Sequence, residues 1–201
     1  MTDPRGAVVG KRLAGIGRIA GFYSAKGGVG KTMCTAVSAI ALAAQGKKIG
    51  ILDLDLQGAS LHVFLGVRPG LPDEDKGILP VRVSENLSLM SVAAFTAELP
   101  LALRGAEVSE ALRELFAVTQ WGALDYLFID MPPGIGEEIL DLARLVPGMT
   151  ALVVSTPARL SIAVVERLLG LLKEMAVPAS GISDGLSSIA SAVRLSRPRS
   201  K

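Results

Sequence analysis

The chain has 201 residues with 21 basic and 19 acidic side chains, so its formal net charge of +2 is too small to predict nucleic-acid binding. Half of the residues are apolar and 4% are aromatic, which predicts one aliphatic core, while no apolar run approaches the roughly 20 residues that cross a bilayer. The single cysteine excludes an intrachain disulfide and favours a reducing, cytoplasmic compartment.

The first 17 residues carry Arg5, Lys11 and Arg12 but no continuous apolar stretch. We therefore interpret residues 1–17 as a basic N-terminal extension and not as a signal peptide. A strand-like run follows from Arg18 to Tyr23, and a helical apolar stretch covers residues 33–44.

The segment between this strand and this helix is glycine-rich and reads SAKGGVGKT over residues 24–32, with Ala25 where the usual phosphate-loop pattern has glycine. Glycines lack a Cβ atom, so the backbone can aim N–H donors at one point beside the positive end of the next helix. Lys31 is expected to reach the β- and γ-phosphates of a nucleotide, and the Thr32 hydroxyl to complete the shell of Mg²⁺. A glycine turn without a ligand is the alternative, but the flanking strand and helix favour phosphate binding. The predicted nucleotide-binding residues are Gly27, Gly28, Val29, Gly30, Lys31, Thr32 and Met33.

Strand-like and helix-like segments alternate along the rest of the chain. Further strands are expected at Lys48–Asp53, Leu87–Val92, Leu124–Asp130 and Thr150–Ser155, and helices at Glu107–Val118 and Leu160–Met175. Strands separated by helices predict an α/β fold with a doubly wound, mostly parallel sheet. Such sheets bind ligands at the carboxyl ends of their strands, where the glycine-rich loop is expected.

Three acidic residues follow or close these strands. Asp53 and Asp55 flank Leu54 at one strand end, and Asp130 closes another strand. A phosphate-bound Mg²⁺ prefers six oxygens and keeps several waters, so we expect Asp130 to support the metal and Asp53 to assist it. Asp55, one step further into the loop, is expected to orient the attacking water. The alternative is that these acids cap helices or lie solvated after their strands.

Four segments resemble one family of nucleotide-binding proteins. They are KGGVGKT at Lys26–Thr32, DLDLQGASLHVFLGV at Asp53–Val67, GILPVRVSENLSLMSV at Gly77–Val92 and WGALDYLFIDMPPGIGEE at Trp121–Glu138. The chain resembles the Mrp/ApbC family of ParA- and MinD-like ATPases, whose deviant phosphate loop begins with Lys-Gly-Gly. The run Asp-Met-Pro-Pro-Gly is typical of the Mrp branch. The resemblance covers residues 18–178, which we expect to form the ATPase domain.

The resemblance implies a P-loop NTPase fold of the SIMIBI type and a homodimer that sandwiches two molecules of Mg-ATP. Lys26 would then contact the phosphates bound to the partner subunit, while Lys31 and Thr32 act within their own subunit. Lys26, Lys31 and Asp55 are the implied catalytic residues, and Thr32, Asp53 and Asp130 the implied metal-linked residues. Turnover is expected to be slow. The implied role is the assembly or transfer of iron–sulfur clusters to apoprotein clients.

Two features depart from that family. Its carriers hold a cluster through a Cys-x-x-Cys pair, whereas this chain has only Cys34, expected to be a buried core residue, so we do not expect it to hold a cluster. Residues 179–201 are rich in serine and arginine where a further buried strand is expected. We interpret them as a partly disordered tail with the C-terminal strands missing, either because the domain is shortened or because the end of the reading frame is altered.

Two alternative functions remain open. A MinD- or ParA-like positioning ATPase would act through partners, but residues 186–195 lack the bulky apolar face of a membrane-targeting helix, and the net charge does not favour DNA. Neither a membrane nor DNA is therefore a predicted partner. The other alternative is a nucleotide-binding remnant with little turnover.

Overall fold

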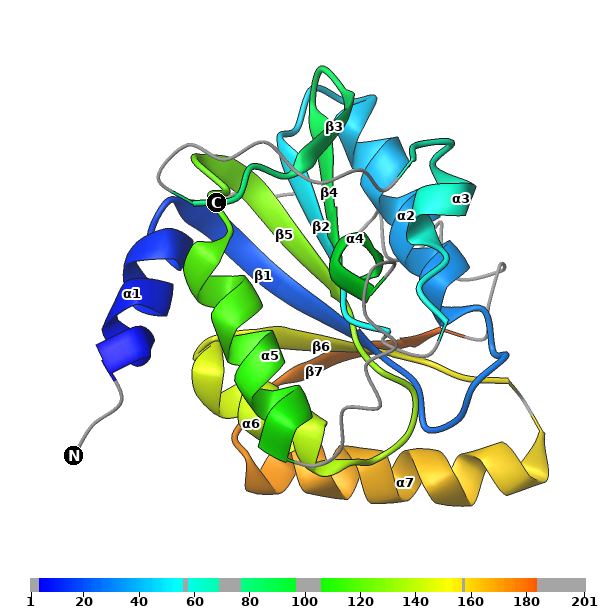
Figure 1. Ribbon diagram of the computed structural model, residues 1–201. Helices are drawn as coiled ribbons and strands as arrows, with labels where there is room; N and C mark the ends of the chain where they lie inside the picture. Colours follow the sequence, from blue (N-terminus) through cyan, green and yellow to red (C-terminus); the bar gives the residue numbers. More distant parts are fainter. Residues whose placement is uncertain (1–3, 56–57, 69–76, 97–105, 157, 184–201) are drawn as a thin grey trace, which may run out of the picture.

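The computed structural model describes residues 4–55, 58–68, 77–96, 106–156 and 158–183. Within these residues one seven-stranded sheet has the order β3-β4-β2-β5-β1-β6-β7 (Figure 1). All neighbouring strands are parallel except the antiparallel pair β3 and β4. The strands are β1 (Ile16–Tyr23), β2 (Ile49–Asp53), β3 (Val81–Ser84), β4 (Leu87–Ser91), β5 (Leu124–Asp130), β6 (Thr150–Val154) and β7 (Ala179–Ser183). The predicted doubly wound, mostly parallel sheet is confirmed.

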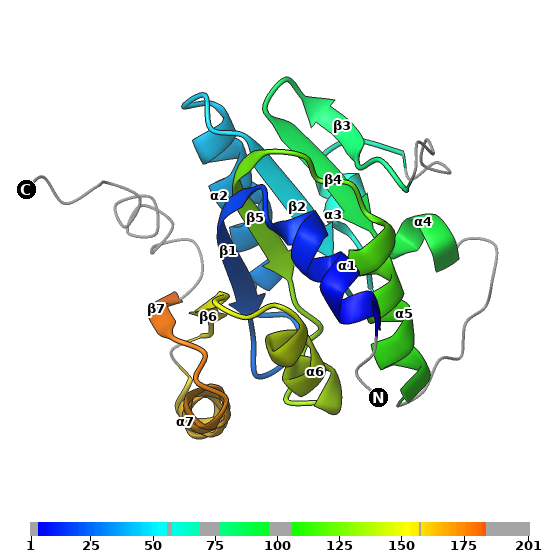
Figure 2. The same ribbon diagram turned by 90° about the vertical axis from the view of Figure 1, so that its left-hand side faces the viewer.

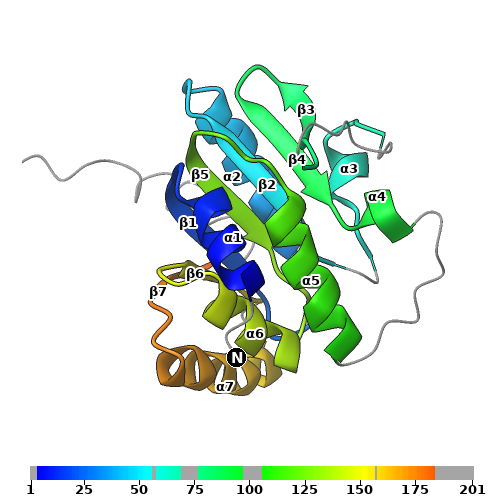
Figure 3. The ribbon, with the colours of Figure 1, turned by 60° about the vertical axis from the view of Figure 1, so that its left-hand side comes forward.

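Helices cover both faces of this sheet (Figures 2 and 3). They are α1 (Pro4–Leu13), α2 (Lys31–Ala43), α3 (Leu61–Phe64), α4 (Ala93–Thr96), α5 (Ala106–Val118), α6 (Glu137–Leu145) and α7 (Arg159–Glu174). One hydrophobic cluster joins α1, α5, α6 and α7 to the sheet, and a second joins α2 and α3 to the opposite face. None of the helices in the described ranges combines the length and the apolar character that a membrane span requires.

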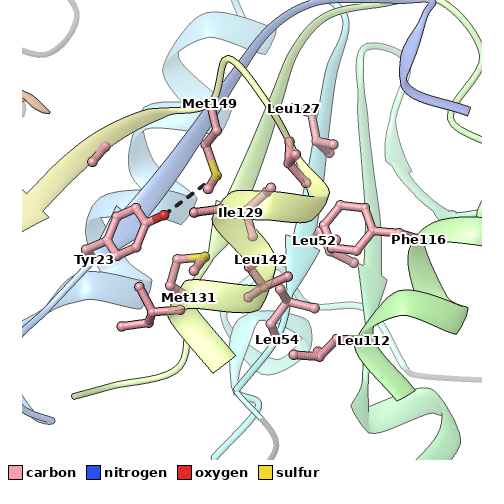
Figure 4. Close-up of a cluster of buried hydrophobic side chains, with 14 of the residues drawn as sticks. Tyr23, Leu52, Leu54, Leu112, Phe116, Leu127, Ile129, Met131, Leu142 and Met149 are labelled. Atoms are coloured by element: carbon pink, nitrogen blue, oxygen red, sulfur yellow. Dashed lines mark hydrogen bonds between the residues drawn. The ribbon is translucent and has the colours of Figure 1, made fainter. Parts of the chain in front are cut away.

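The larger of the two hydrophobic clusters packs α5 and α6 against the central strands of the sheet. Figure 4 shows Leu112 and Phe116 of α5 and Leu142 of α6 packed against strand residues such as Leu127 and Ile129. Full burial of these side chains, at about 25 cal/mol per Å² of apolar surface, is the main force that holds α5 and α6 to the sheet.

Aromatic packing also explains a glycine in the middle of β2. A Cβ added at Gly50 would lie 2.6 Å from Leu124 Cδ1 and 2.8 Å from the ring of Trp121. The strand therefore lies close to the indole ring, and its parallel register with β5 sets Asp53 opposite Asp130. The two strand-terminal acids predicted from the sequence are brought together in this way.

The N-terminal segment is part of the fold. The predicted strand from Arg18 begins two residues earlier, at Ile16, and the preceding residues form α1. Val9 and Leu13 of that helix are buried in the larger cluster, and α1 contacts α5. The basic segment at residues 1–17 thus contains a helix whose apolar side covers the sheet.

The prediction of a partly disordered tail at residues 179–201 was wrong for residues 179–183. These residues form β7, which pairs in parallel with β6 through Leu152 and Gly181, so the sheet gains an edge strand where a tail was expected to begin. Residues 184–201, the remainder of the predicted tail, lie outside the described residues.

Candidate functional site

The glycine-rich loop connects the end of β1 to the start of α2. Gly28 and Gly30 have φ values of +77° and +88°, in the left-handed region that favours glycine. Gly30 is the N-cap residue of α2 and provides no side-chain cap, and the space beside Gly27 and Gly28 is open. Open space beside the loop glycines thus lies next to the uncapped, positive end of a helix dipole, an arrangement that fits a phosphate group.

The two lysines of the loop have different environments. Lys26 is exposed, whereas only 6% of the Lys31 side chain is exposed. Lys31 Nζ lies 2.7 Å from Oδ1 of Asp130, which is fully buried. The loop therefore has one cation turned into the site and one turned toward solvent.

Asp130 is held by the first turns of α2. Thr32 Oγ1 donates a hydrogen bond to Asp130 Oδ2 at 2.7 Å, and Thr35 Oγ1 lies 2.9 Å from Asp130 Oδ1. Since Asp130 also pairs with Lys31, the carboxylate contacts three residues of the helix that follows the loop. Thr32, Lys31 and Asp130 thus form one cluster, as expected if they serve a common ligand.

Asp53 lies beside Asp130 on the neighbouring strand. Its Oδ2 accepts a hydrogen bond from Ser91 Oγ at 3.2 Å, and its Oδ1 accepts one from the Asp55 backbone N–H at 3.2 Å. Burial raises the pKa of Asp53 to about 6, and the charge of Asp130 adds to this increase. The hydrogen bonds and Lys31 lower the pKa by less. Two buried carboxylates side by side favour a cation between or near them.

The donor set fits Mg²⁺ that is also bound to phosphate. No cluster of three or more His, Cys, Asp or Glu side chains that could hold a metal by itself occurs in the described part of the chain. Mg²⁺ takes one or two protein oxygens and completes its octahedral shell with water and substrate phosphates. The Thr32 hydroxyl with the two aspartates behind it, Asp53 and Asp130, is such a partial set.

Asp55 is turned into its own loop. Its carboxylate accepts a hydrogen bond from the Gly58 N–H at 3.1 Å, and the residue is half-buried. The predicted role of Asp55 in orienting water requires this side chain to leave that turn, and that role stays a prediction.

Two further residues complete the comparison with the sequence. Cys34 is buried in the smaller hydrophobic cluster, as expected. Thr35 was not predicted as a site residue. Its signal was a polar side chain three residues after Thr32 in a mostly apolar helix, where it lies on the same face as Thr32.

We expect Asp53→Asn to stabilise the protein at neutral pH. A carboxyl whose pKa rises from 3.8 in the unfolded chain to about 6 binds more protons when folded, so its contribution to stability falls as the pH rises through that window. The slope is up to about 1.4 kcal/mol per pH unit. The variant should therefore have a higher melting temperature than the wild type at pH 7.5. The difference between their free energies of unfolding should be smaller by roughly 1 kcal/mol at pH 5.

Thermal melts at the two pH values check this expectation. Asp125→Asn is the matched control, because Asp125 is an exposed carboxylate on the same strand as Asp130. A variant Asp53→Asn that melts below the wild type at pH 7.5 would show that the carboxylate stabilises the fold.

Curated proteins similar to this chain share the name iron–sulfur cluster carrier protein. The chain is 38% identical over 171 residues to an iron–sulfur cluster carrier protein of Saccharolobus solfataricus, which covers 83% of this chain and 58% of that relative. It is 37% identical over 179 residues to an iron–sulfur cluster carrier protein of Escherichia coli, with 87% of this chain and 48% of that relative covered. The chain thus spans about half to three fifths of the length of these relatives.

Solved structures have the same fold. A nucleotide-binding protein of Archaeoglobus fulgidus in complex with ADP matches with a TM-score of 0.76 at 34% identity, covering 88% of this chain and 70% of that chain. The septum site-determining protein MinD of Pyrococcus horikoshii, complexed with Mg-ADP, matches with a TM-score of 0.58 at 23% identity, covering 82% and 68%. The second match is a likeness of fold alone.

The family comparison covers most of the chain. Residues 15–194 match the ParA group in the family described as NUBPL iron-transfer P-loop NTPase. The glycine-rich loop, the buried Lys31 and the strand-terminal Asp130 all lie within that match, and the predicted resemblance is confirmed. The chain therefore belongs to the NUBPL iron-transfer family of P-loop NTPases.

Proposed function

We propose that this chain binds Mg-ATP in the glycine-rich loop and hydrolyses it slowly. The observation that carries the proposal is the cluster at the start of α2, where Lys31 and Thr32 both contact the buried Asp130 beside an uncapped helix N-terminus. A P-loop places a cation, a hydroxyl and backbone donors at the same point because all three serve the β- and γ-phosphates.

Each side chain has a separate task in this proposal. Lys31 leaves Asp130 and pairs with the phosphates, while the Thr32 hydroxyl and the carboxylates of Asp130 and Asp53 hold the metal and its waters. Bound Mg²⁺ supplies charge neutralisation to the phosphate oxygens. Asp55 leaves its turn and orients the water that attacks the γ-phosphate. Loop residues near Asp55 then respond to the γ-phosphate, as nucleotide switches do.

The proposal extends to a homodimer that closes around ATP. Lys26 is exposed on the loop, so its charge is available to phosphates bound by a second subunit. The curated relatives are named iron–sulfur cluster carrier proteins, which supports a role for this chain in cluster assembly or transfer to apoprotein clients. Cys34, which is buried, is the one cysteine among these 201 residues, so the thiolates that hold a cluster would come from outside these residues.

Lys26→Ala is expected to separate nucleotide binding from dimerisation. The variant should bind Mg-ATP in its own loop with an affinity within about threefold of the wild type, because Lys31 and Thr32 are unchanged. Its ATP-dependent dimer should be at least about tenfold weaker, since a buried charge pair across an interface is lost. Sedimentation velocity with and without Mg-ATP, over a range of protein concentrations, measures both subunit states.

Lys47→Ala is the control for a lost surface charge, because Lys47 is exposed beyond the far end of α2. Equal ATP-dependent dimerisation of Lys26→Ala and Lys47→Ala would rule out the proposed contact across the interface. A wild-type chain that stays monomeric with Mg-ATP would rule out the dimer itself.

A further inference from the structure

Thr35 is a fully buried hydroxyl between two acceptors. Its Oγ1 lies 3.1 Å from the backbone oxygen of Lys31 and 2.9 Å from Oδ1 of Asp130. A hydroxyl has one proton, so at any moment it donates to only one of these oxygens. Both acceptors are already within hydrogen-bond distance, so donation can pass from one to the other by rotation of the hydroxyl alone.

The second partner of the same carboxylate oxygen is Lys31. Its Nζ lies 2.7 Å from Asp130 Oδ1, while Thr32 donates to the other oxygen, Oδ2. In this arrangement Lys31 neutralises Asp130. A buried carboxylate that loses its cation is costly unless other donors satisfy it.

Nucleotide binding removes that cation in the function proposed above. Lys31 moves toward the phosphates, and Asp130 Oδ1 loses its ion pair while Asp53, a second buried acid, stays beside it on the neighbouring strand. Thr35 Oγ1 lies 2.9 Å from Oδ1 and can then donate its proton to this oxygen.

We propose that Thr35 is a positioning residue for the metal site, which passes its hydrogen bond from the Lys31 carbonyl to Asp130 when Lys31 turns to the nucleotide. This inference rests on the proposed function. The hydroxyl satisfies Asp130 Oδ1 and fixes the rotation of the carboxylate, so that Oδ2 stays directed at the Thr32 hydroxyl. Thr35 itself touches neither the nucleotide nor the metal.

The experiment measures the Mg²⁺ concentration that nucleotide binding requires. ATP is titrated into the full chain by calorimetry over a series of Mg²⁺ concentrations and once in EDTA, for the wild type, Thr35→Val and Thr35→Ser. Thr119→Val is the matched control, because Thr119 is also fully buried and also donates to the carbonyl four residues earlier, that of Leu115, without facing a carboxylate. Thermal melts accompany each titration.

Thr35→Val should raise the Mg²⁺ concentration for half-maximal binding by about tenfold, the effect expected when a hydrogen bond to a charged group is lost. Its ATP affinity in EDTA should stay within about twofold of the wild type. Thr35→Ser keeps the hydroxyl and should restore the wild-type Mg²⁺ requirement. Thr119→Val should lower the melting temperature without changing that requirement. If Thr35→Val does not fold, Thr35→Ala removes the same hydroxyl and has the same expected result.

Three results would overturn the inference. An unchanged Mg²⁺ requirement in Thr35→Val, in a chain whose wild type binds Mg-ATP, would limit Thr35 to a structural role and leave the proposed function intact. An equal loss in Thr35→Ser, which keeps the hydroxyl, would assign the effect to altered packing at this position and not to the hydrogen bond. No ATP binding by the wild-type chain at any Mg²⁺ concentration would overturn the proposed function as well.

Discussion

Asp130→Ala should both destabilise the protein and abolish Mg-dependent ATP hydrolysis. The substitution leaves Lys31, which is 6% exposed, without its ion partner, and it removes the acceptor of the Thr32 hydroxyl. Removing one member of a buried ion pair costs about 3–5 kcal/mol, because the remaining charge stays out of water. Loss of the carboxylate behind the metal should lower the hydrolysis rate at least about a hundredfold.

Urea unfolding and phosphate release measure the two effects separately. Asp130→Asn is the matched variant, because the amide keeps an oxygen for the threonines but not the negative charge. It should regain part of the lost stability and none of the hydrolysis. Wild-type stability and turnover in Asp130→Ala would contradict both the structural and the functional role of this carboxylate.

Lys31→Met should remove nucleotide binding with a smaller loss of stability. Methionine fills the buried space of the lysine stem, so the lost interactions are the charge on the phosphates and the ion pair with Asp130. We expect the affinity for Mg-ATP to fall at least about a hundredfold, since a buried cation on two phosphates is worth several charge-assisted hydrogen bonds.

A double-mutant cycle sharpens this prediction. Lys31→Met and Asp130→Ala remove two ends of one contact, so the double variant should be more stable than the sum of the single changes by about 1–3 kcal/mol. It should still fail to bind Mg-ATP. Additive losses of stability would show that the pair does not couple in solution.

Much of the fold could be predicted because the central strands are mostly apolar segments separated by helical patterns. The strand Leu124–Asp130 has the predicted bounds, and the helix predicted at Glu107–Val118 begins one residue earlier, at Ala106. The glycine-rich loop and the two strand-terminal acids could also be placed, since parallel strands bring their carboxyl ends to one edge.

The parts that were not predicted depend on tertiary contacts. The strand β3 is a four-residue edge strand whose alternate residues face solvent, and β7 is composed of small residues with weak strand preference. Pairing with β4 and with β6 places these two strands. The helix α1 is polar overall, and only its contact with α5 identifies Val9 and Leu13 as core residues.

The site residues also divide into those that a sequence motif predicts and one that depends on tertiary packing. The phosphate-loop motif identifies Lys31 and Thr32 from sequence because the spacing itself carries the chemistry. The contact of Thr35 with the Lys31 carbonyl is local to the helix, whereas its contact with Asp130 depends on how α2 packs over the end of β5, which no spacing rule predicts.

The central claim is that this chain binds Mg-ATP in its glycine-rich loop, and a calorimetric titration of the full chain with Mg-ATP tests it most directly. We expect saturable binding that weakens in EDTA and disappears in Lys31→Met. Absence of binding by the wild-type chain, or equal binding by the wild type and Lys31→Met, would contradict it.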